Sequence, residues 1–506
     1  MYDRRAMLLR NSLWNFAGSA LPALVALATV PFLIQGLGLE GFGIVTLIAS
    51  IVGYFGILDI NLSAGAIKYL AQHHATNDRE RFSETFWFGV MFYGALGLIG
   101  GLLLAAGSAT VLARFFTVSA ALQTQTLSAL HWAAFGFALS QIQNYLLVVP
   151  QALQRYERSA GGEAVFGITS NILSALIAMA GGGIAGVIAG RVAVLSVNVV
   201  WLCFMLNHLG MPLTPRLPRR ELCLSLMRFS GHSYLSRLAS MLHQHADKLI
   251  IASVAGPVAL AIYSVPAQLS GRILGLTYRL SSVIYPRVSA LAASGQDRQM
   301  QQLYLDATRF MTYLNFAVLA IIALTGATFL RRWVGAEFVD SGYPVLLLVT
   351  LGLLMDSLTI IPSLVNDGLG HPRITGRFAI ARGLLGAGMV YLGTHWAGII
   401  GAAVAHLLCS VLMTSLFLLY VHGRTVPVTL AETWNACWRP SLLSGCCVLL
   451  LLFPLRWWMG DSLAALFVMA GISSMLLLAI GLIFIVHSSE RSALLSSTRR
   501  LMSGAR

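Results

Sequence analysis

Fourteen mostly apolar segments, nearly all of them long enough to cross a lipid bilayer, follow one another along this chain of 506 residues. A helix that spans a bilayer needs about 20 predominantly apolar residues, and its backbone hydrogen bonds must be satisfied within the helix. The segments are 12–37, 42–70, 85–112, 127–149, 163–181, 184–206, 227–254, 258–284, 310–330, 343–365, 375–393, 399–420, 441–455 and 463–486. The sequence therefore predicts an all-α, polytopic membrane protein of about 14 transmembrane helices. The number of spans is twelve if segments 441–455 and 163–181 are not counted. Segment 441–455 is short, and only a Gly-rich turn separates 163–181 from the segment that follows it.

The composition supports a membrane protein rather than a soluble one. Hydrophobic residues make up 57% of the chain and charged residues only 10%, with a mean hydropathy of +0.77. Soluble domains carry about 25% charged residues. The net charge of +14 is spread over small basic clusters between apolar segments instead of forming one stripe. Such clusters are typical of cytoplasmic membrane loops, so we expect no nucleic-acid partner.

The distribution of arginine predicts the orientation. With the N-terminus in the cytoplasm, most loop arginines face inward, Arg298 and Arg373 among them, because Lys and Arg are enriched in cytoplasmic loops. The outer loops would hold Arg114, Arg331, Arg332 and Arg456. An even number of spans then places both termini in the cytoplasm. The longest outer loops, 114–126 and 331–342, are too short to fold as catalytic domains, so we expect a protein that is not an enzyme.

A weak internal repeat divides the chain. The Pro-containing linker 207–222 separates six segments from the next six, and the Gly-containing turn 36–43 after the first segment resembles 254–261 after the seventh. Many transporters consist of two such halves with the substrate site between them near the midplane. We therefore predict two six-helix lobes in pseudo-two-fold relation, residues 1–210 and 211–424, followed by two extra helices and a cytoplasmic tail, 425–506.

Fixed charges lie inside the apolar hairpin 237–287. A central Arg, Lys or Asp costs about 2.5–3.5 kcal/mol on insertion scales, so these charges are expected to line a cavity rather than face lipid. Arginine forks bind phosphate oxygens in bidentate fashion, which suits a pyrophosphate. The predicted phosphate contacts are Arg237, Lys248, Arg272, Arg279 and Lys68. The alternative is that Arg279 extends to headgroups, that Lys248 pairs with Asp247, and that Lys68 is an interface anchor.

Three acids fall within predicted spans: Asp59, Asp247 and Asp356. Membrane carboxylates either relay ions or pair with a positive side chain. Coupling to H⁺ or Na⁺ through Asp59 or Asp356 is one interpretation, and pairing with an arginine such as Arg191 or Arg382 is the other. The six cysteines show no CxxC pair and the histidines no metal-ligand spacing, so we expect no metal site and no cofactor.

Several residues resemble a known family. Asn11 and Asn15 precede Pro31, a Gly-rich turn and the sequence Leu-Asp-Ile-Asn-Leu at 58–62, while the second half carries Asp-Lys-Leu-Ile-Ile at 247–251 and Ala-Ile-Tyr at 261–263. The chain is similar in these features to bacterial polysaccharide transporters, the O-antigen or lipid-linked oligosaccharide flippases. They belong to the multidrug/oligosaccharidyl-lipid/polysaccharide exporter superfamily. At 59–61 the chain has Asp-Ile-Asn where Asp-Leu-Gly is expected, which leaves the local geometry there open.

The resemblance implies a function. Such relatives carry an undecaprenyl-pyrophosphate-linked oligosaccharide, an O-antigen or exopolysaccharide repeat unit, across the bacterial inner membrane. The mechanism would be alternating access through the cationic cavity. The expected partners are membrane lipids, a polysaccharide polymerase and a chain-length regulator. Two alternatives predict different features. A cation-coupled multidrug extruder would line its cavity with acids and aromatics, and a membrane glycan polymerase or ligase would present a large outer loop.

Overall fold

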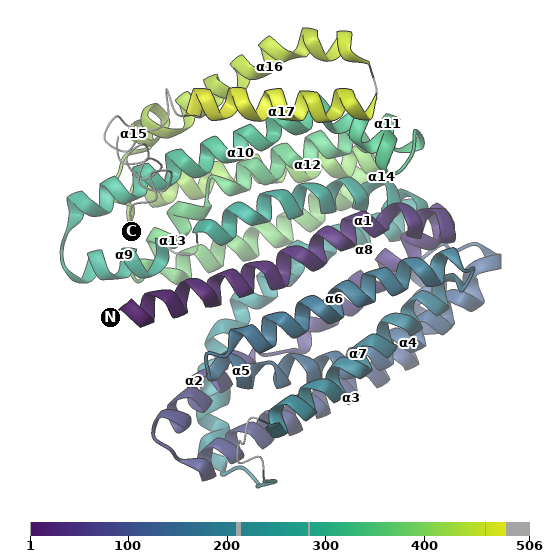
Figure 1. Ribbon diagram of the computed structural model, residues 1–506, viewed down its shortest axis with the longest axis vertical. Helices are drawn as coiled ribbons and strands as arrows, with labels where there is room; N and C mark the ends of the chain where they lie inside the picture. The colour runs from purple at the N-terminus through teal and green to yellow at the C-terminus, as the bar shows by residue number, and fades with distance from the viewer. Residues whose placement is uncertain (1, 209–213, 282–283, 461, 482–506) are drawn as a thin grey trace, which may run out of the picture. The chain divides into compact units, whose positions relative to one another are not determined.

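The computed structural model describes residues 2–208, 214–281, 284–460 and 462–481, and all regular structure in these residues is helical (Figure 1). The chain forms two compact units, Met1–Ser264 and Val265–Arg506. The elements that begin in the first unit are α1 (Tyr2–Tyr54), η1 (Phe55–Leu58), α2 (Leu62–Ala75), α3 (Arg79–Phe115), α4 (Ala120–Leu146), α5 (Val148–Ala152), α6 (Tyr156–Met179), α7 (Gly183–His208) and α8 (Arg220–Ser281). Those of the second unit are α9 (Ile284–Ala293), α10 (Asp297–Trp333), α11 (Glu337–Asp340), α12 (Gly342–Ser357), α13 (Ile360–Gly368), α14 (Pro372–His422), α15 (Leu430–Thr433), the π-helical turn η2 (Trp434–Trp438), α16 (Arg439–Met459) and α17 (Leu463–Ile480).

The helices confirm the predicted all-α membrane fold. Among the described residues, nine helical stretches are long and apolar enough to cross a membrane. Three elements each contain two helices joined at non-helical residues: α1 at Gly38, α8 at Gly256 and α14 at Ala397 and Gly398. Twelve of the 14 predicted segments therefore coincide with a helix or a helix half, the last of them over its described part, while 42–70 and 343–365 each extend over a break between two helices. The lobe boundaries at residues 210 and 424 stay a prediction.

The two turns of the predicted repeat share one backbone conformation. Gly38 has φ 72° and ψ 172°, and Gly256 has φ 87° and ψ 173°. This region of φ/ψ space is essentially restricted to glycine because it has no Cβ. Aligning 36–43 with 254–261 places Gly38 opposite Gly256. The first and seventh predicted segments therefore end in turns that match in both sequence position and geometry.

The first unit packs its helices closely around buried aromatic side chains. In Figure 1, α3, α4 and α7 run side by side, and α6 packs against α1. Tyr93 of α3 and Tyr145 of α4 are fully buried and stack with ring centroids 5.3 Å apart. The Tyr145 hydroxyl donates to the carbonyl of Thr85 at 3.0 Å, which satisfies its polar end inside the bundle. These contacts fix the position of the Tyr93 hydroxyl, which donates a hydrogen bond to Asp59.

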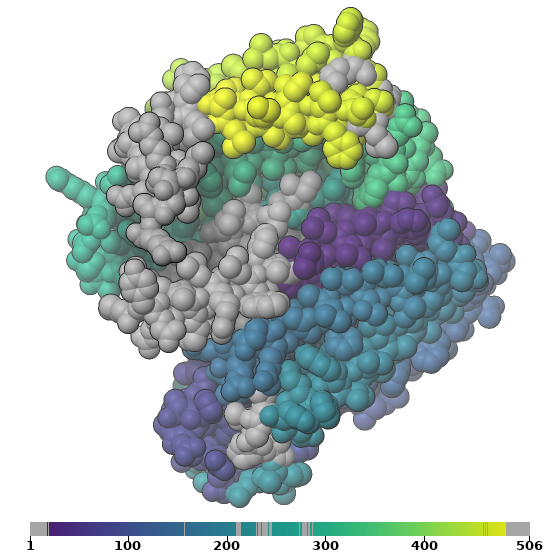
Figure 2. Space-filling model, in the orientation of Figure 1, coloured from purple at the N-terminus to yellow at the C-terminus, as the bar shows by residue number. Residues whose placement is uncertain are grey.

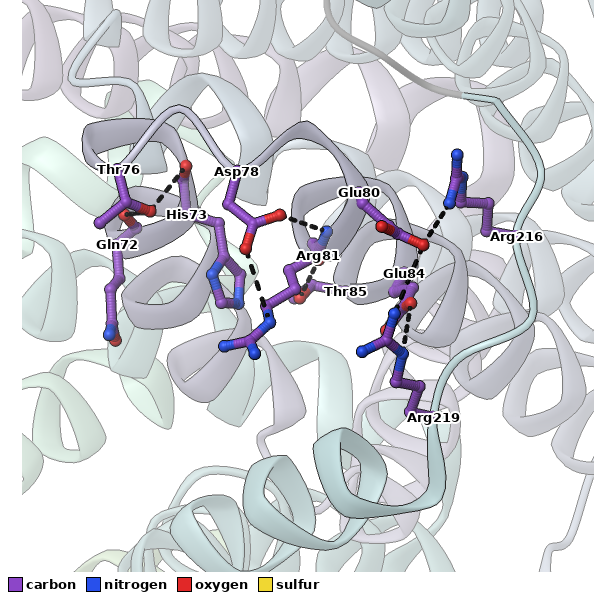
Figure 3. A network of polar contacts seen from close by, with 10 residues as sticks. All are labelled: Gln72, His73, Thr76, Asp78, Glu80, Arg81, Glu84, Thr85, Arg216 and Arg219. Atoms are coloured by element: carbon purple, nitrogen blue, oxygen red, sulfur yellow. Dashed lines mark hydrogen bonds and ion pairs between the residues drawn. The ribbon is translucent and has the colours of Figure 1, made fainter.

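The described end of the linker is attached to the start of α3 by ion pairs (Figure 3). Glu80 accepts from Arg216 at 2.5 Å and from Arg219 at 3.4 Å, and Glu84 pairs with Arg219 at 3.2 Å. The Glu84 side chain is only 5% exposed. Nearby, burial lowers the pKa of His73, although the charge of Asp78 acts in the opposite direction. Two loops that the arginine distribution assigns to the cytoplasmic side thus contact each other.

Loss of these ion pairs is expected to loosen the linker. In the double variant E80Q/E84Q, we expect trypsin to cleave after Arg216 and Arg219 about fivefold faster, because each partly exposed pair contributes up to about 1 kcal/mol. Timed proteolysis of the detergent-purified protein measures the rate. The matched control is E221Q, since Glu221 lies on α8 close to the same arginines but is exposed. An unchanged rate in E80Q/E84Q would contradict the attachment.

The second unit places its two C-terminal helices against α10. Figure 1 shows α16 and α17 beside α10, and Val448, Leu452 and Met469 are buried there. The outward side chains are large and apolar: Leu450, Phe453, Trp457, Trp458, Phe467 and Met475 are more than half exposed. In Figure 2 these helices form the yellow-green and yellow surface. A surface of this composition suits contact with lipid chains rather than water.

Candidate functional site

The predicted cationic residues are described only in part. The side chains of Arg237 and Arg279 lie outside the described residues. Arg272 is exposed on α8, and Lys248 is half-buried on the same element. Lys68 is exposed on α2, outside the nine apolar stretches found in the described chain, with its Nζ 5.5 Å from the centroid of the Tyr69 ring. Contact of these residues with a phosphate, and the cavity that would join them, stay predictions.

Two of the predicted spans are interrupted helices rather than continuous ones. The sequence predicts one helix over 42–70, but η1 and residues 59–61, which begin with the extended Asp59, separate α1 from α2. Asn61 adopts the left-handed conformation there, with φ 60° and ψ 41°. The segment 343–365 breaks between α12 and α13 at residues 358–359. Non-helical backbone at membrane depth is tolerated where protein or a water-filled cavity surrounds it, and it recurs at transporter binding sites.

Asp59 lies at the first interruption and accepts hydrogen bonds there. Its Oδ1 accepts from the Tyr93 hydroxyl at 2.9 Å and from the backbone N–H of Asn61 at 2.9 Å. The Tyr93 oxygen also accepts from the backbone N–H of Ser63 at 3.0 Å. A charge-assisted bond from a tyrosine held by stacking is stronger than one between neutral groups. Asp59 and Tyr93 therefore join the broken ends of the helix to the neighbouring α3.

Asp356 lies at the second interruption and forms an ion pair with Arg382 of α14. The Arg382 guanidinium also donates to Ser410 Oγ at 3.0 Å. Both charged side chains are largely buried, with 17% of Asp356 and 19% of Arg382 exposed. Asp356 thus has one of the two partners that the sequence suggested. A buried carboxylate of this kind depends on its positive partner, because an isolated charge inside a protein is costly.

Asp247 links the two arms of the α8 hairpin. Its Oδ2 accepts from the Tyr263 hydroxyl at 3.4 Å, across the turn at Gly256, and its Oδ1 accepts from the Lys248 backbone N–H at 2.8 Å. Tyr263 is 1% exposed. Both residues belong to the sequences that carried the family resemblance, 247–251 and 261–263. The structure gives these two motifs a joint role in closing the hairpin.

A cavity of about 410 Å³ in the first unit gathers further polar groups. Glu163 of α6, Arg191 and Asn198 of α7 and Gln143 of α4 line it. Arg191 Nε donates to Ser174 Oγ at 3.0 Å, so this arginine is held inside its own unit. The sequence indicated Arg191 only as a partner of an acid, and it did not indicate Glu163 as a site residue. Single charges within spans were the signal that could have indicated both.

Each unit holds charged groups near breaks or turns of its helices: Asp59 and Asp247 in the first unit and Asp356 in the second. The sequence indicated Asp59, Asp247 and Asp356 but not Tyr93, whose role depends on contacts between α2 and α3. Among the described residues, no group of three or more His, Cys, Asp or Glu side chains could hold a metal ion. The arrangement offers fixed charges and hydrogen bonds, which are suited to binding and conformational change.

The sequence of this chain is similar to those of a known family and of two named relatives. The model of a family described as polysaccharide biosynthesis protein matches residues 37–342. The putative O-antigen transporter of Shigella flexneri is 23% identical over 427 residues, covering 83% of this chain and 99% of its own length. The probable flippase AglR of Haloferax volcanii is 23% identical over 414 residues, covering 80% of this chain and 81% of its own.

Solved structures resemble the fold. The lipid II flippase MurJ, in an inward closed conformation, superimposes with a TM-score of 0.75 at 12% identity, covering 94% of this chain and 98% of its own. An inward-facing multidrug resistance transporter of the MATE family gives a TM-score of 0.67 at 16% identity, covering 81% of this chain and 98% of its own. At this level of identity the likeness concerns the arrangement of helices.

Proposed function

This chain belongs to the family of polysaccharide biosynthesis proteins, and from that premise we propose that it carries a lipid-linked oligosaccharide across the bacterial inner membrane. Its relatives are transporters and flippases by name, and accordingly the protein is a transporter and not an enzyme. The observation that carries the proposal is the match to an O-antigen transporter along 99% of that protein's length. The MurJ-like fold supports a substrate with a lipid anchor.

The proposed mechanism is alternating access. The pyrophosphate and its glycan, an O-antigen or exopolysaccharide repeat unit, enter a cationic cavity from the cytoplasm while the undecaprenyl chain stays in lipid. Arg272, Lys248, Arg237, Arg279 and Lys68 are the proposed phosphate contacts. The two helix interruptions support such a mechanism, because a broken helix can change angle at the break without unfolding. A polymerase and a chain-length regulator on the outer side are proposed partners.

The two acids at the interruptions have different proposed roles. Asp356 is paired with Arg382, which favours a structural role for this carboxylate. Asp59 lies at the first interruption and accepts from the Tyr93 hydroxyl, and carboxylates within the spans of transporters often relay ions. We therefore propose Asp59 as the residue that couples transport to H⁺ or Na⁺.

Arg272 provides a specific test of the phosphate contacts. The variant R272A is expected to lower transport at least tenfold, because one charge-assisted contact contributes about 1.5–3 kcal/mol. R272K should retain part of the activity, since lysine keeps the charge but not the bidentate fork. Complementation of a deletion strain, scored as surface glycan at equal protein level, measures the effect. R287A is the matched control, because Arg287 is exposed on α9. Full rescue by R272A would remove Arg272 from the site.

The same deletion strain tests the function itself. Without the protein, the lipid-linked oligosaccharide should accumulate on the cytoplasmic face of the membrane while the surface glycan disappears. Extraction and quantification of the lipid-linked intermediate gives the first quantity, and a lectin assay on whole cells gives the second. A deletion strain with normal surface glycan and no intermediate would contradict the proposal.

A further inference from the structure

The first turns of α10 form one wall of a second cavity, of about 400 Å³, whose other wall includes the π-helical turn η2. Its α10 lining includes Arg298, Gln301, Gln302 and Arg309, and Ala436 of η2 faces them. Gln301, Gln302 and Arg309 follow Arg298 by three, four and eleven residues, a spacing that places them along one face of the helix. Single π-helical turns in α-helices recur at functional sites. The cavity therefore combines a basic and amide-rich helix face with an unusual backbone turn.

The polar groups of this cavity are held in place. Arg309 is 10% exposed and donates to Asp306 Oδ1 at 3.2 Å, so the carboxylate orients the guanidinium. Gln301 Nε2 donates to the carbonyl of Pro427 at 2.7 Å, and the Cys437 thiol donates to the carbonyl of Leu305 at 3.3 Å. These bonds attach η2 and the preceding loop to α10. A cavity with fixed walls can bind a ligand without the cost of ordering them.

The charge of the cavity selects for an anion. Two arginines face one aspartate, which leaves a net charge of +1, and the two glutamine amides add neutral donors. Arg298 is exposed at the mouth while Arg309 is buried. Guanidinium and amide N–H groups are the donors that phosphate oxygens accept from.

The predicted orientation puts this cavity where a bilayer meets the cytoplasm. The orientation predicted from the loop arginines places the start of α10 on the cytoplasmic side, and the apolar part of this helix follows directly. Trp434, at 48% exposure, and Trp438 lie on η2. Tryptophan is enriched at membrane–water interfaces, and basic pockets between helices on the cytoplasmic side bind anionic lipid headgroups.

We infer that this cavity binds the phosphate of an anionic phospholipid of the inner leaflet, in addition to the transported substrate. The headgroup phosphate accepts from Arg298 and Gln302 at the mouth, with Arg309 behind them. Free inorganic phosphate shares this chemistry but lacks acyl chains, which would lie along exposed apolar side chains such as Phe310, next to Arg309 on α10, and Trp434 of η2. Occupancy would hold the start of α10 and η2 together.

Lipid binding is measured on the full-length protein in uncharged detergent, as the shift in melting temperature during titration. The probes are a short-chain phosphatidylglycerol, the matching phosphatidylcholine and inorganic phosphate. For the unmodified protein we expect a saturable rise with phosphatidylglycerol and little or none with the other two probes. In R298Q the concentration for half-maximal shift should rise about fivefold, since a basic residue at a membrane surface contributes about 1 kcal/mol toward an anionic lipid.

Two further variants, R373Q and Q302L, serve as the control and as a second test of lipid binding. R373Q removes an exposed arginine at the start of α14, assigned to the same side of the membrane but outside the cavity, and should bind as the unmodified protein does. If R298Q does not fold, Q302L carries the test with an expected two- to threefold weakening. Equal weakening in R373Q, or a response to inorganic phosphate equal to that for phosphatidylglycerol, would overturn the inference. Because the readout is binding, its failure is distinct from a failure of transport.

Discussion

Replacing Arg382 by methionine is expected to destabilise the protein by about 3–5 kcal/mol, because Asp356 would then be a buried charge without its ion-pair partner. Ser410 would also lose the hydrogen bond that it accepts from Arg382. The unfolding midpoint in detergent, followed by fluorescence, measures the loss. We also expect a lower yield of folded protein, since a change of this size is a large part of a domain's stability.

Two controls separate this pair from a general effect of losing an arginine. R377M changes an exposed arginine of the same helix and is expected to alter stability by less than about 0.5 kcal/mol. The double variant D356L/R382M should recover most of the lost stability, since apolar residues of similar size can replace a buried ion pair at little cost. If R382M melts like the unmodified protein, the pair does not hold α12 to α14.

Replacing Gly43 by alanine is expected to have the second largest effect, about 3 kcal/mol. An ideal Cβ at this position lies 1.9 Å from the carbonyl oxygen of Pro257 and 2.6 Å from its carbonyl carbon. Both atoms belong to the backbone, so the two Gly-containing turns would have to move apart, and overpacking of this kind costs about 1–3 kcal/mol or more. G94A is the matched control, because nothing lies within 4 Å of a Cβ there.

The Gly43 variant also bears on function. The turns 36–43 and 254–261 contact each other through Gly43 and Pro257, so their separation should impair transport more than it impairs expression. Complementation at equal protein level, with G94A beside it, gives the comparison. A G43A protein with unchanged melting temperature and full complementation would show that the two turns are not closely packed in the membrane.

The helical fold could be predicted from the sequence because only helices and closed barrels satisfy the backbone hydrogen bonds inside a bilayer. Apolar segments of about 20 residues gave the helices, and the glycines at 38 and 256 indicated the paired turns, since only glycine tolerates that backbone conformation. The interruptions at 55–61 and 358–359 were missed. The sequence stays apolar through both interruptions. The breaks depend on side-chain contacts, such as that between Asp59 and Tyr93, and a hydropathy pattern carries no information on such contacts.

The residues of the candidate site were predicted less completely than the helices, because the partner of a buried charge depends on how helices pack. Arg191 is the one arginine of segment 184–206 and Arg382 lies in segment 375–393 beside Arg377, so the sequence could not choose between Arg191 and Arg382 as a partner for Asp356. The choice depends on packing between α12 and α14, whereas Arg191 donates to Ser174 in the other unit. Tyr93 was not recognised at all, because one hydroxyl within an apolar helix gives no pattern. The cationic contacts of Arg272 and Lys248 remain predictions.

Reconstitution measures directly whether this protein moves a lipid-linked oligosaccharide between leaflets. Proteoliposomes that contain the purified protein and an undecaprenyl-pyrophosphate-linked oligosaccharide are treated with a membrane-impermeant enzyme that cleaves the exposed glycan. With the active protein, cleavage is expected to proceed past the half of the substrate in the outer leaflet to near completion, and to stop at about half in liposomes without protein. Arrest at the same level in both preparations would show that the protein does not move this substrate between leaflets.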